Sequence, residues 1–193
     1  MIHNFKKSLQ FEREQTEKAD NFYRNILKVS DIKRFNSDSE EDMIYQKQDI
    51  DVILTLNDKN YKISEKFRFK DFGDLYVEVY SKFPHTMGWM NSGSPDAIMY
   101  FTPDNAYWIG HKTLKEFYIN KLFAVLKLEW FEYLYNSGQT LVKKNIVLDN
   151  KISNISLIQA HNKDGKEWKT MGVSIHFDIL EKYGVKIKRF ILQ

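Results

Sequence analysis

The sequence predicts a mixed α/β (α+β) fold in which a central mixed sheet is flanked by helices. Three observations predict it: a helical region at the start, several strand-like segments with alternating apolar and polar residues, and a capped helix followed by further strands. The chain has 193 residues, which is enough for one domain with a sizeable core and too few for a second full domain. We therefore expect a single domain over residues 1–193.

The first expected element is a helix over Ser8–Leu27, a segment rich in Glu, Lys, Arg and Gln with apolar residues at helical spacing. A cluster of Ser, Asp and Glu at Asn36–Asp42 indicates a surface loop. Next, Lys47–Leu56 and Tyr61–Phe69 alternate apolar and polar residues, and the polar stretch Asn57–Asn60 between them is typical of a turn. These two segments predict a β-hairpin.

Three strands are expected after the hairpin, over Leu75–Ser81, Asp96–Phe101 and Tyr107–Ile109, because the runs are rich in β-branched and aromatic residues. The clearest helix covers Thr113–Tyr135, which opens on a Thr–Glu capping box and is followed by the terminating residue Gly138. Residues 139–193 are expected to complete or extend the sheet, with strands at Ile152–Ala160, Met171–Phe177 and Val185–Leu192 and a helical turn at Asp178–Tyr183.

Composition and charge limit the cellular location and the binding partners that we expect for the protein. The net charge of +3 allows a nucleic-acid partner without requiring one. The absence of cysteine excludes disulfides and cysteine zinc sites and is compatible with a reducing cytoplasm. Met1–Lys7 has basic residues but no apolar segment after them, and no apolar run approaches the roughly 18 residues that span a bilayer. We expect a cytoplasmic protein without a membrane segment.

The expected hairpin gathers charged side chains on one face. If its turn is centred after Asp58, Asp51 faces Lys66 and Asp49 faces Arg68, with directly opposed Cβ atoms about 5 Å apart. One interpretation is a solvated face with two cross-strand ion pairs. The other is a site in which carboxylates bind a hard cation and the lysine positions a water or balances charge, as phosphodiester hydrolysis requires. The geometry alone leaves both open.

Three segments carry a resemblance to a known family: Tyr45–Leu54, Ile63–Phe67 and Leu75–Val79. They resemble the PD-(D/E)XK, or restriction-endonuclease-like, nuclease superfamily, in which a strand bearing an Asp pairs with a strand bearing an acid, any residue, then Lys. Gly88-Trp89-Met90 is similar to a pattern in some small phage and bacterial members. The resemblance covers roughly residues 12–109 and implies a restriction-endonuclease-like core within about residues 12–135.

The resemblance assigns Asp51 as the metal-binding Asp and Lys66 as the motif lysine. The motif acid is expected two residues before the lysine, where this chain has Ser64. Three explanations stay open: a bulge turns Glu65 toward Asp51, Glu78 on the following strand supplies the second carboxylate, or the site is degraded. We favour Glu78, because a charge in an otherwise apolar and aromatic strand needs a partner, which a metal or Lys66 would supply.

The resemblance implies a metal-dependent DNA endonuclease that uses Mg²⁺ or Mn²⁺, with Lys66 orienting the water or steadying charge. In that family a helix before the hairpin often supplies a further acid, here Asp20 or Glu17. Two other functions compete: a catalytically inactive nuclease-like module that binds DNA or protein, and a structural protein with a solvated charged face. Many enzymes of the class act as homodimers. The expected metal ligands are Asp51, Glu78 or Glu65, and Asp20.

Overall fold

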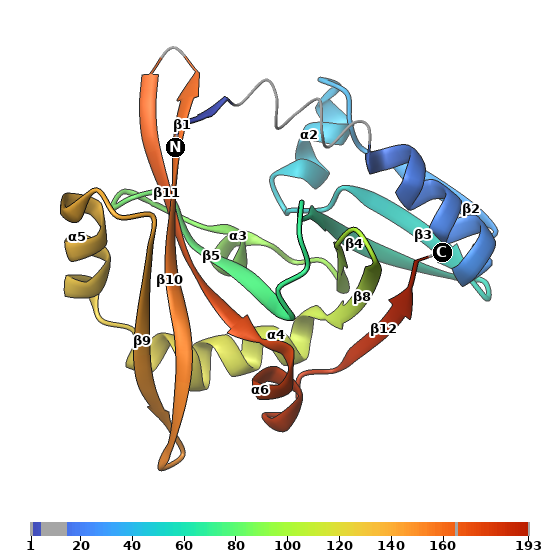
Figure 1. The fold of residues 1–193 in the computed structure, drawn as a ribbon. Helices are drawn as coiled ribbons and strands as arrows, with labels where there is room; N and C mark the ends of the chain where they lie inside the picture. Colours follow the sequence, from blue (N-terminus) through green and yellow to red (C-terminus); the bar gives the residue numbers. More distant parts are fainter. Residues whose placement is uncertain (1, 5–14, 165, 193) are drawn as a thin grey trace. The chain divides into compact units, whose positions relative to one another are not determined.

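The computed structural model describes residues 2–4, 15–164 and 166–192 (Figure 1). The chain separates into two compact units, each assembled from segments that are distant in the sequence. We call them the hairpin unit and the long-strand unit, after the strands that distinguish them. The hairpin unit comprises Leu9–Phe72, Ser92–Lys112 and Lys186–Gln193, and the long-strand unit comprises Met1–Ser8, Gly73–Asn91 and Thr113–Val185.

The predicted α/β fold class is confirmed, since helices flank a mixed six-stranded sheet in the hairpin unit and a second six-stranded sheet is present in the long-strand unit. In the hairpin unit the strand order is β12-β8-β7-β4-β3-β2. β4 and β7 run parallel, and the other neighbours are antiparallel. The strands are β2 (Asp31–Arg34), β3 (Val52–Leu56), β4 (Lys59–Phe67), β7 (Ala97–Phe101), β8 (Asn105–Gly110) and β12 (Ile187–Ile191).

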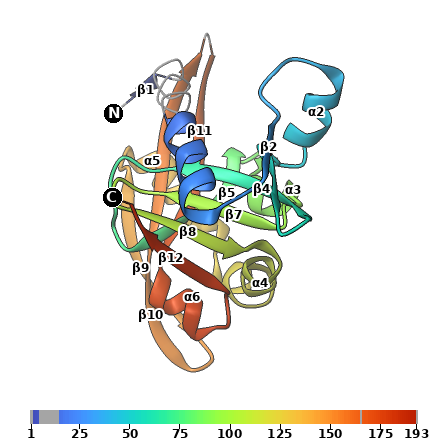
Figure 2. The same cartoon turned by 90° about the vertical axis from the view of Figure 1, so that its right-hand side faces the viewer.

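The N-terminal helix of the hairpin unit covers residues 15–22 and continues as the π-helical segment η1 (Tyr23–Leu27) (Figure 2). Its buried residues Ala19, Phe22 and Tyr23 pack on β3, β4 and β7, in a cluster with side chains such as Val52 and Met99. This apolar contact is the core that holds the helix on one face of the sheet. The expected helix over Ser8–Leu27 is thus present from residue 15, and its first part lies outside the described residues.

The segment before the hairpin differs from the prediction. The cluster expected to be a loop ends in a helix, α2 (Glu40–Gln46), because the Ser39 hydroxyl accepts a hydrogen bond from the Asp42 N–H and three acidic residues occupy the first turn. The strand therefore starts at Val52 rather than Lys47. The hairpin turn is Asn57-Asp58, with both residues at positive φ, so the pairing is shifted from the expected register and Leu56 faces Lys59.

The long-strand unit contains β1 (Ile2–Asn4), β5 (Asp74–Lys82), β6 (Thr86–Met87), β9 (Leu141–Leu148), β10 (Lys151–Asp164) and β11 (Lys166–His176). The order is β1-β10-β11-β5-β6, and β9 pairs with the first part of β10, on the side away from β11. The C-terminal strands were expected to extend the hairpin sheet, but only β12 does so. β9, β10 and β11 build a sheet of their own around β5, and α6 (Phe177–Lys182) confirms the predicted helical turn.

The helix expected over Thr113–Tyr135 is divided. It consists of α4 (His111–Phe117), η2 (Tyr118–Leu122), η3 (Phe123–Val125) and α5 (Leu128–Ser137). Leu126 is in an extended conformation and separates η3 from α5. Gly138 adopts φ +71° after α5 and ends it, as predicted. A short helix, α3 (Trp89–Ser92), follows β6. Within the described part of the chain no helix is long and apolar enough to cross a bilayer.

Candidate functional site

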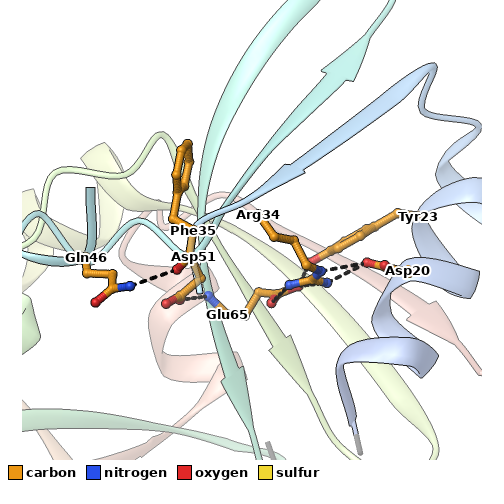
Figure 3. A network of polar contacts seen from close by, with 7 residues as sticks. All are labelled: Asp20, Tyr23, Arg34, Phe35, Gln46, Asp51 and Glu65. Atoms are coloured by element: carbon orange, nitrogen blue, oxygen red, sulfur yellow. Dashed lines mark hydrogen bonds and ion pairs between the residues drawn. The ribbon is translucent and has the colours of Figure 1, made fainter. Parts of the chain in front are cut away.

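The backbone of Asp51 is fixed where three strands of the hairpin unit meet. Its N–H donates to the Ile63 carbonyl of β4 over 2.9 Å, and its own carbonyl accepts from the Phe35 N–H, just after β2, over 3.0 Å. The Asp51 side chain turns back to β4, where Oδ2 accepts a 2.7 Å hydrogen bond from the Glu65 N–H (Figure 3). Rigid strands therefore hold this carboxylate.

Burial raises the pKa of Asp51 to about 6. The neighbouring carboxylates of Asp49 and Glu65 push this pKa in the same direction, whereas the Lys66 ammonium and the Glu65 N–H lower it. Negative charge at this position is therefore only partly compensated. A carboxyl group in such surroundings gains from an added cation.

Asp49 lies in the turn between α2 and β3, where its φ of +58° bends the chain into the left-handed region. Both of its oxygens are engaged by β4: Lys66 Nζ lies 2.8 Å from Oδ1, and the Ser64 hydroxyl donates to Oδ2 over 2.7 Å. The expected pairing of Asp49 with Arg68 is thus wrong, and Lys66 pairs with Asp49 because of the changed register. We call Asp49, Asp51, Ser64 and Lys66 the hairpin cluster.

Glu65 lies on the opposite face of β4, as strand alternation predicts. Its carboxylate is nearly buried and accepts from the Tyr23 hydroxyl over 2.6 Å and from both Arg34 nitrogens Nη1 and Nη2 over 2.6 and 3.1 Å (Figure 3). β4 keeps a regular register with β7 through this position, where Glu65 pairs with Met99, so no bulge turns the carboxylate toward Asp51. The hydrogen bond between Glu65 and Asp51 is made by the backbone N–H of Glu65, and the Glu65 carboxylate binds Tyr23 and Arg34 instead.

The guanidinium of Arg34 also binds Asp20 of the N-terminal helix, with Nη2 and Nε lying 2.6 and 2.9 Å from Oδ1. Burial alone would lower the pKa of Arg34, but the hydrogen bonds and charges of Glu65 and Asp20 outweigh it and hold the pKa above its ordinary value. Burial, followed by the charge of Glu65, raises the pKa of the Tyr23 hydroxyl well above its usual range. Asp20 is thus bound in an ion pair, and Glu17 is exposed.

Glu78 was expected on a strand neighbouring the hairpin. The strands that flank β4 are β3 and β7, whereas Glu78 lies on β5 of the long-strand unit, opposite Gly172 of β11. Strand pairing therefore does not place Glu78 beside β4, and Glu78 as a metal ligand stays a prediction from the sequence. Close packing explains the glycine at position 88, because a Cβ there would lie 2.3 Å from the Glu78 carbonyl oxygen.

A second polar group lies just beyond the C-terminal ends of β4 and β7. Asp71 Oδ2 accepts from the Asn105 side-chain amide over 2.7 Å and from the hydroxyls of Thr102 and Tyr107 over 3.0 Å each. Burial, with the Asp71 carboxylate, raises the pKa of Tyr107 to about 12. These hydrogen bonds hold the chain after β4 against the β7–β8 turn. The polar residues of this group therefore have a structural role.

The hairpin cluster supplies two carboxylates for a cation. Among the residues that the structure describes, no group of three or more His, Cys, Asp or Glu side chains is arranged to bind a metal. Mg²⁺ is commonly bound through one or two protein carboxylates, with waters and substrate phosphates completing its shell. Asp49 and Asp51 supply that number of carboxylates, with both Asp49 oxygens engaged by Lys66 and Ser64 and with burial as the main cause of the raised pKa of Asp51.

Comparisons of the chain with protein-family models, with curated proteins and with solved structures give no match. The interpretation of the site therefore rests on its own residues. Sequence reasoning missed Arg34 and Tyr23, which bind Glu65 and so decide where its carboxylate points. A lone arginine in a short strand and a tyrosine in a helix gave no signal, because their partners are 31 and 42 residues away.

Proposed function

We propose that this chain is a metal-dependent nuclease that hydrolyses phosphodiester bonds of DNA at the hairpin cluster. The observation that supports this most is the Asp51 carboxyl group, whose pKa is raised to about 6 by burial and by neighbouring carboxylates. Such a group favours a bound cation, and perturbed carboxyls of this kind concentrate at functional sites. The resemblance to PD-(D/E)XK nucleases supplies the reaction class.

Each residue of the cluster has a role in this proposal. Asp49 and Asp51 would hold Mg²⁺ or Mn²⁺, which when bound lowers the pKa of an attacking water and neutralises charge on the phosphate. The Glu65 N–H and the Ser64 hydroxyl fix the two carboxylates. Lys66, held 2.8 Å from Asp49, would contact a phosphate oxygen or orient the water through its ammonium hydrogens.

A second candidate is a nuclease-like module that binds DNA without cleaving it. Two contacts favour it: Ser64 replaces the motif acid and donates to Asp49, and the Glu65 carboxylate is neutralised by Arg34. A cation site with two carboxylates then has less charge than one with three. This module would bind DNA with little dependence on Asp51. A homodimer and a cytoplasmic location remain predictions from the sequence.

The test is nicking of supercoiled plasmid by the purified chain with Mg²⁺ or Mn²⁺, beside an EDTA control. The informative variant is Asp51→Asn, which keeps the side-chain shape and removes the charge. The matched control is Asp58→Asn, an aspartate in the turn of the same hairpin whose φ of +60° asparagine tolerates. Cleavage that needs the metal and Asp51 but survives Asp58→Asn supports the nuclease. Binding without cleavage on duplex, single-stranded and branched DNA supports the second candidate.

A further inference from the structure

Lysines and aromatic rings alternate on one side of α5 in the long-strand unit. Trp130 and Tyr133 are three residues apart, so their side chains lie on the same helix face. Lys144 of β9 places its Nζ 5.5 Å from the Trp130 ring centre and 6.0 Å from that of Tyr133. Lys127, the residue directly before α5, places its Nζ 5.7 Å from the Trp130 ring centre. We call these four residues the lysine–aromatic face.

The face is held rigidly and open to solvent. Phe131 and Leu134 of α5 are buried and fix the helix to the unit. Tyr133 is 53% exposed and Trp130 is half-buried, so both rings can be reached from solvent. Lys144 occupies a position in β9, whose ladder with β10 fixes its backbone. A preformed face loses little side-chain freedom when it binds a ligand.

Charge and ring chemistry together select the ligand. The four side chains carry two positive charges and two π-faces, and Lys127 Nζ also lies 3.8 Å from Glu129 Oε1. Exposed cation–π contacts add little to the stability of a fold, so stability alone explains little of this arrangement. Aromatic rings interleaved with ammonium groups match a chain of flat bases joined by phosphates.

We propose that the lysine–aromatic face binds single-stranded nucleic acid, with bases stacked on Trp130 and Tyr133 and phosphates bound by Lys127 and Lys144. A duplex offers no free base faces along its length, so the rings favour single strands. The lysines contribute the salt-dependent part of the affinity. The site is separate from the proposed hydrolysis at the hairpin cluster, because stacking and phosphate binding need no divalent metal.

The test measures fluorescence anisotropy of a labelled oligothymidylate of about 12 nucleotides, an oligouridylate and a duplex of equal length, all in EDTA so that metal-dependent cleavage cannot interfere. We expect Trp130→Ala to weaken single-strand binding at least about fivefold, from the lost stacking. Lys127→Ala with Lys144→Ala should flatten the slope of log K against log salt by about 1.4, which is roughly 0.7 per lost phosphate contact. Thermal melting of each variant checks its folding.

The matched control is Lys143→Ala, because Lys143 is the exposed neighbour of Lys144 on β9 and points to the other face of the strand. It should leave the affinity and the salt slope nearly unchanged. The proposal is overturned by equal binding of duplex and single strand, by an equal loss in Lys143→Ala and Lys144→Ala, or by absence of binding at about 50 mM salt. Binding that Asp51→Asn leaves intact separates this site from the proposed nuclease.

Discussion

Arg34 and Glu65 form a bidentate ion pair that joins β2 to β4 across the intervening strand β3, with nitrogen–oxygen distances of 2.6 and 3.1 Å. The side chains are only 15% and 4% exposed, so the pair is largely withdrawn from water. Asp20 binds the same guanidinium, which adds the N-terminal helix to the linkage. Since the Glu65 N–H holds Asp51, this ion pair lies directly behind the hairpin cluster.

Removal of one partner of the ion pair should be costly. Arg34→Met leaves the Glu65 carboxylate buried without its counter-charge, and we expect the free energy of unfolding to fall by about 3–5 kcal/mol in urea denaturation. The control is Lys33→Met, which removes the exposed ion pair with Glu41 and should change the free energy of unfolding very little. Equal losses in the two variants would show that burial of the Arg34 pair has no energetic consequence.

The stability of the metal-free protein should depend on Asp51 ionisation. The pKa of Asp51 is raised to about 6 in the folded state from an ordinary value of 3.8, so its contribution is fully present below pH 3.8 and is lost as the pH rises through 6. A shift of about two units corresponds to roughly 3 kcal/mol. In EDTA, Asp51→Asn should therefore be more stable than wild type at pH 8 and show a weaker decline from pH 4 to pH 8.

A carboxylate at position 64 should convert the cluster into a stronger cation site. The Ser64 hydroxyl lies 2.7 Å from Asp49 Oδ2, so Ser64→Asp places two negative charges together and should lower the melting temperature in EDTA. Mg²⁺ should reverse the loss, with a stabilisation of about 2.7 kcal/mol at a metal concentration 100 times Kd. Ser64→Asn, which adds similar bulk without charge, is the control. If Mg²⁺ does not change the melting temperature of Ser64→Asp, a cation site at this cluster is contradicted.

Lys66 should matter for the reaction more than for folding. Lys66→Met removes the ammonium that lies beside Asp49, and we expect the cleavage rate to fall by about 10²–10³ if this group stabilises charge in the transition state. The matched control is Lys62→Met, an exposed lysine on the same strand. Unchanged cleavage by Lys66→Met, with metal dependence intact, would remove Lys66 from the proposed mechanism.

The sequence predicted most strands because alternation is a local signal. β4, β5, β7 and β12 lie close to their expected bounds, whereas β10 and β11 are longer than expected and β9 was not expected. It did not predict which strands pair, since β5 follows the hairpin in sequence yet joins β11 in the other sheet. Pairing depends on contacts between distant segments, and a pattern within one segment does not contain them.

The candidate site was predicted in part. The grouping of Asp49, Asp51 and Lys66 on one side of the hairpin followed from alternation, which tolerates the change of register because the parity is preserved. The predicted partner of Lys66 was wrong, because the turn at Asn57-Asp58 changes the register of β3 and β4 and because Asp49 lies in the turn after α2 rather than in the strand. The role of Arg34 could not be predicted from the sequence, since it depends on a contact with the distant residue Glu65.

The strand β12 follows the long-strand unit in the sequence and forms one edge of the sheet that contains the hairpin. The hairpin unit therefore cannot close until the segment between β8 and β12 has been synthesised, and each unit is assembled from segments that are not continuous in the sequence. Deletion of residues 186–193 would leave the β8 hydrogen-bonding edge uncovered and open to pairing with other chains. We therefore expect chains that lack β12 to aggregate more readily than chains that carry it.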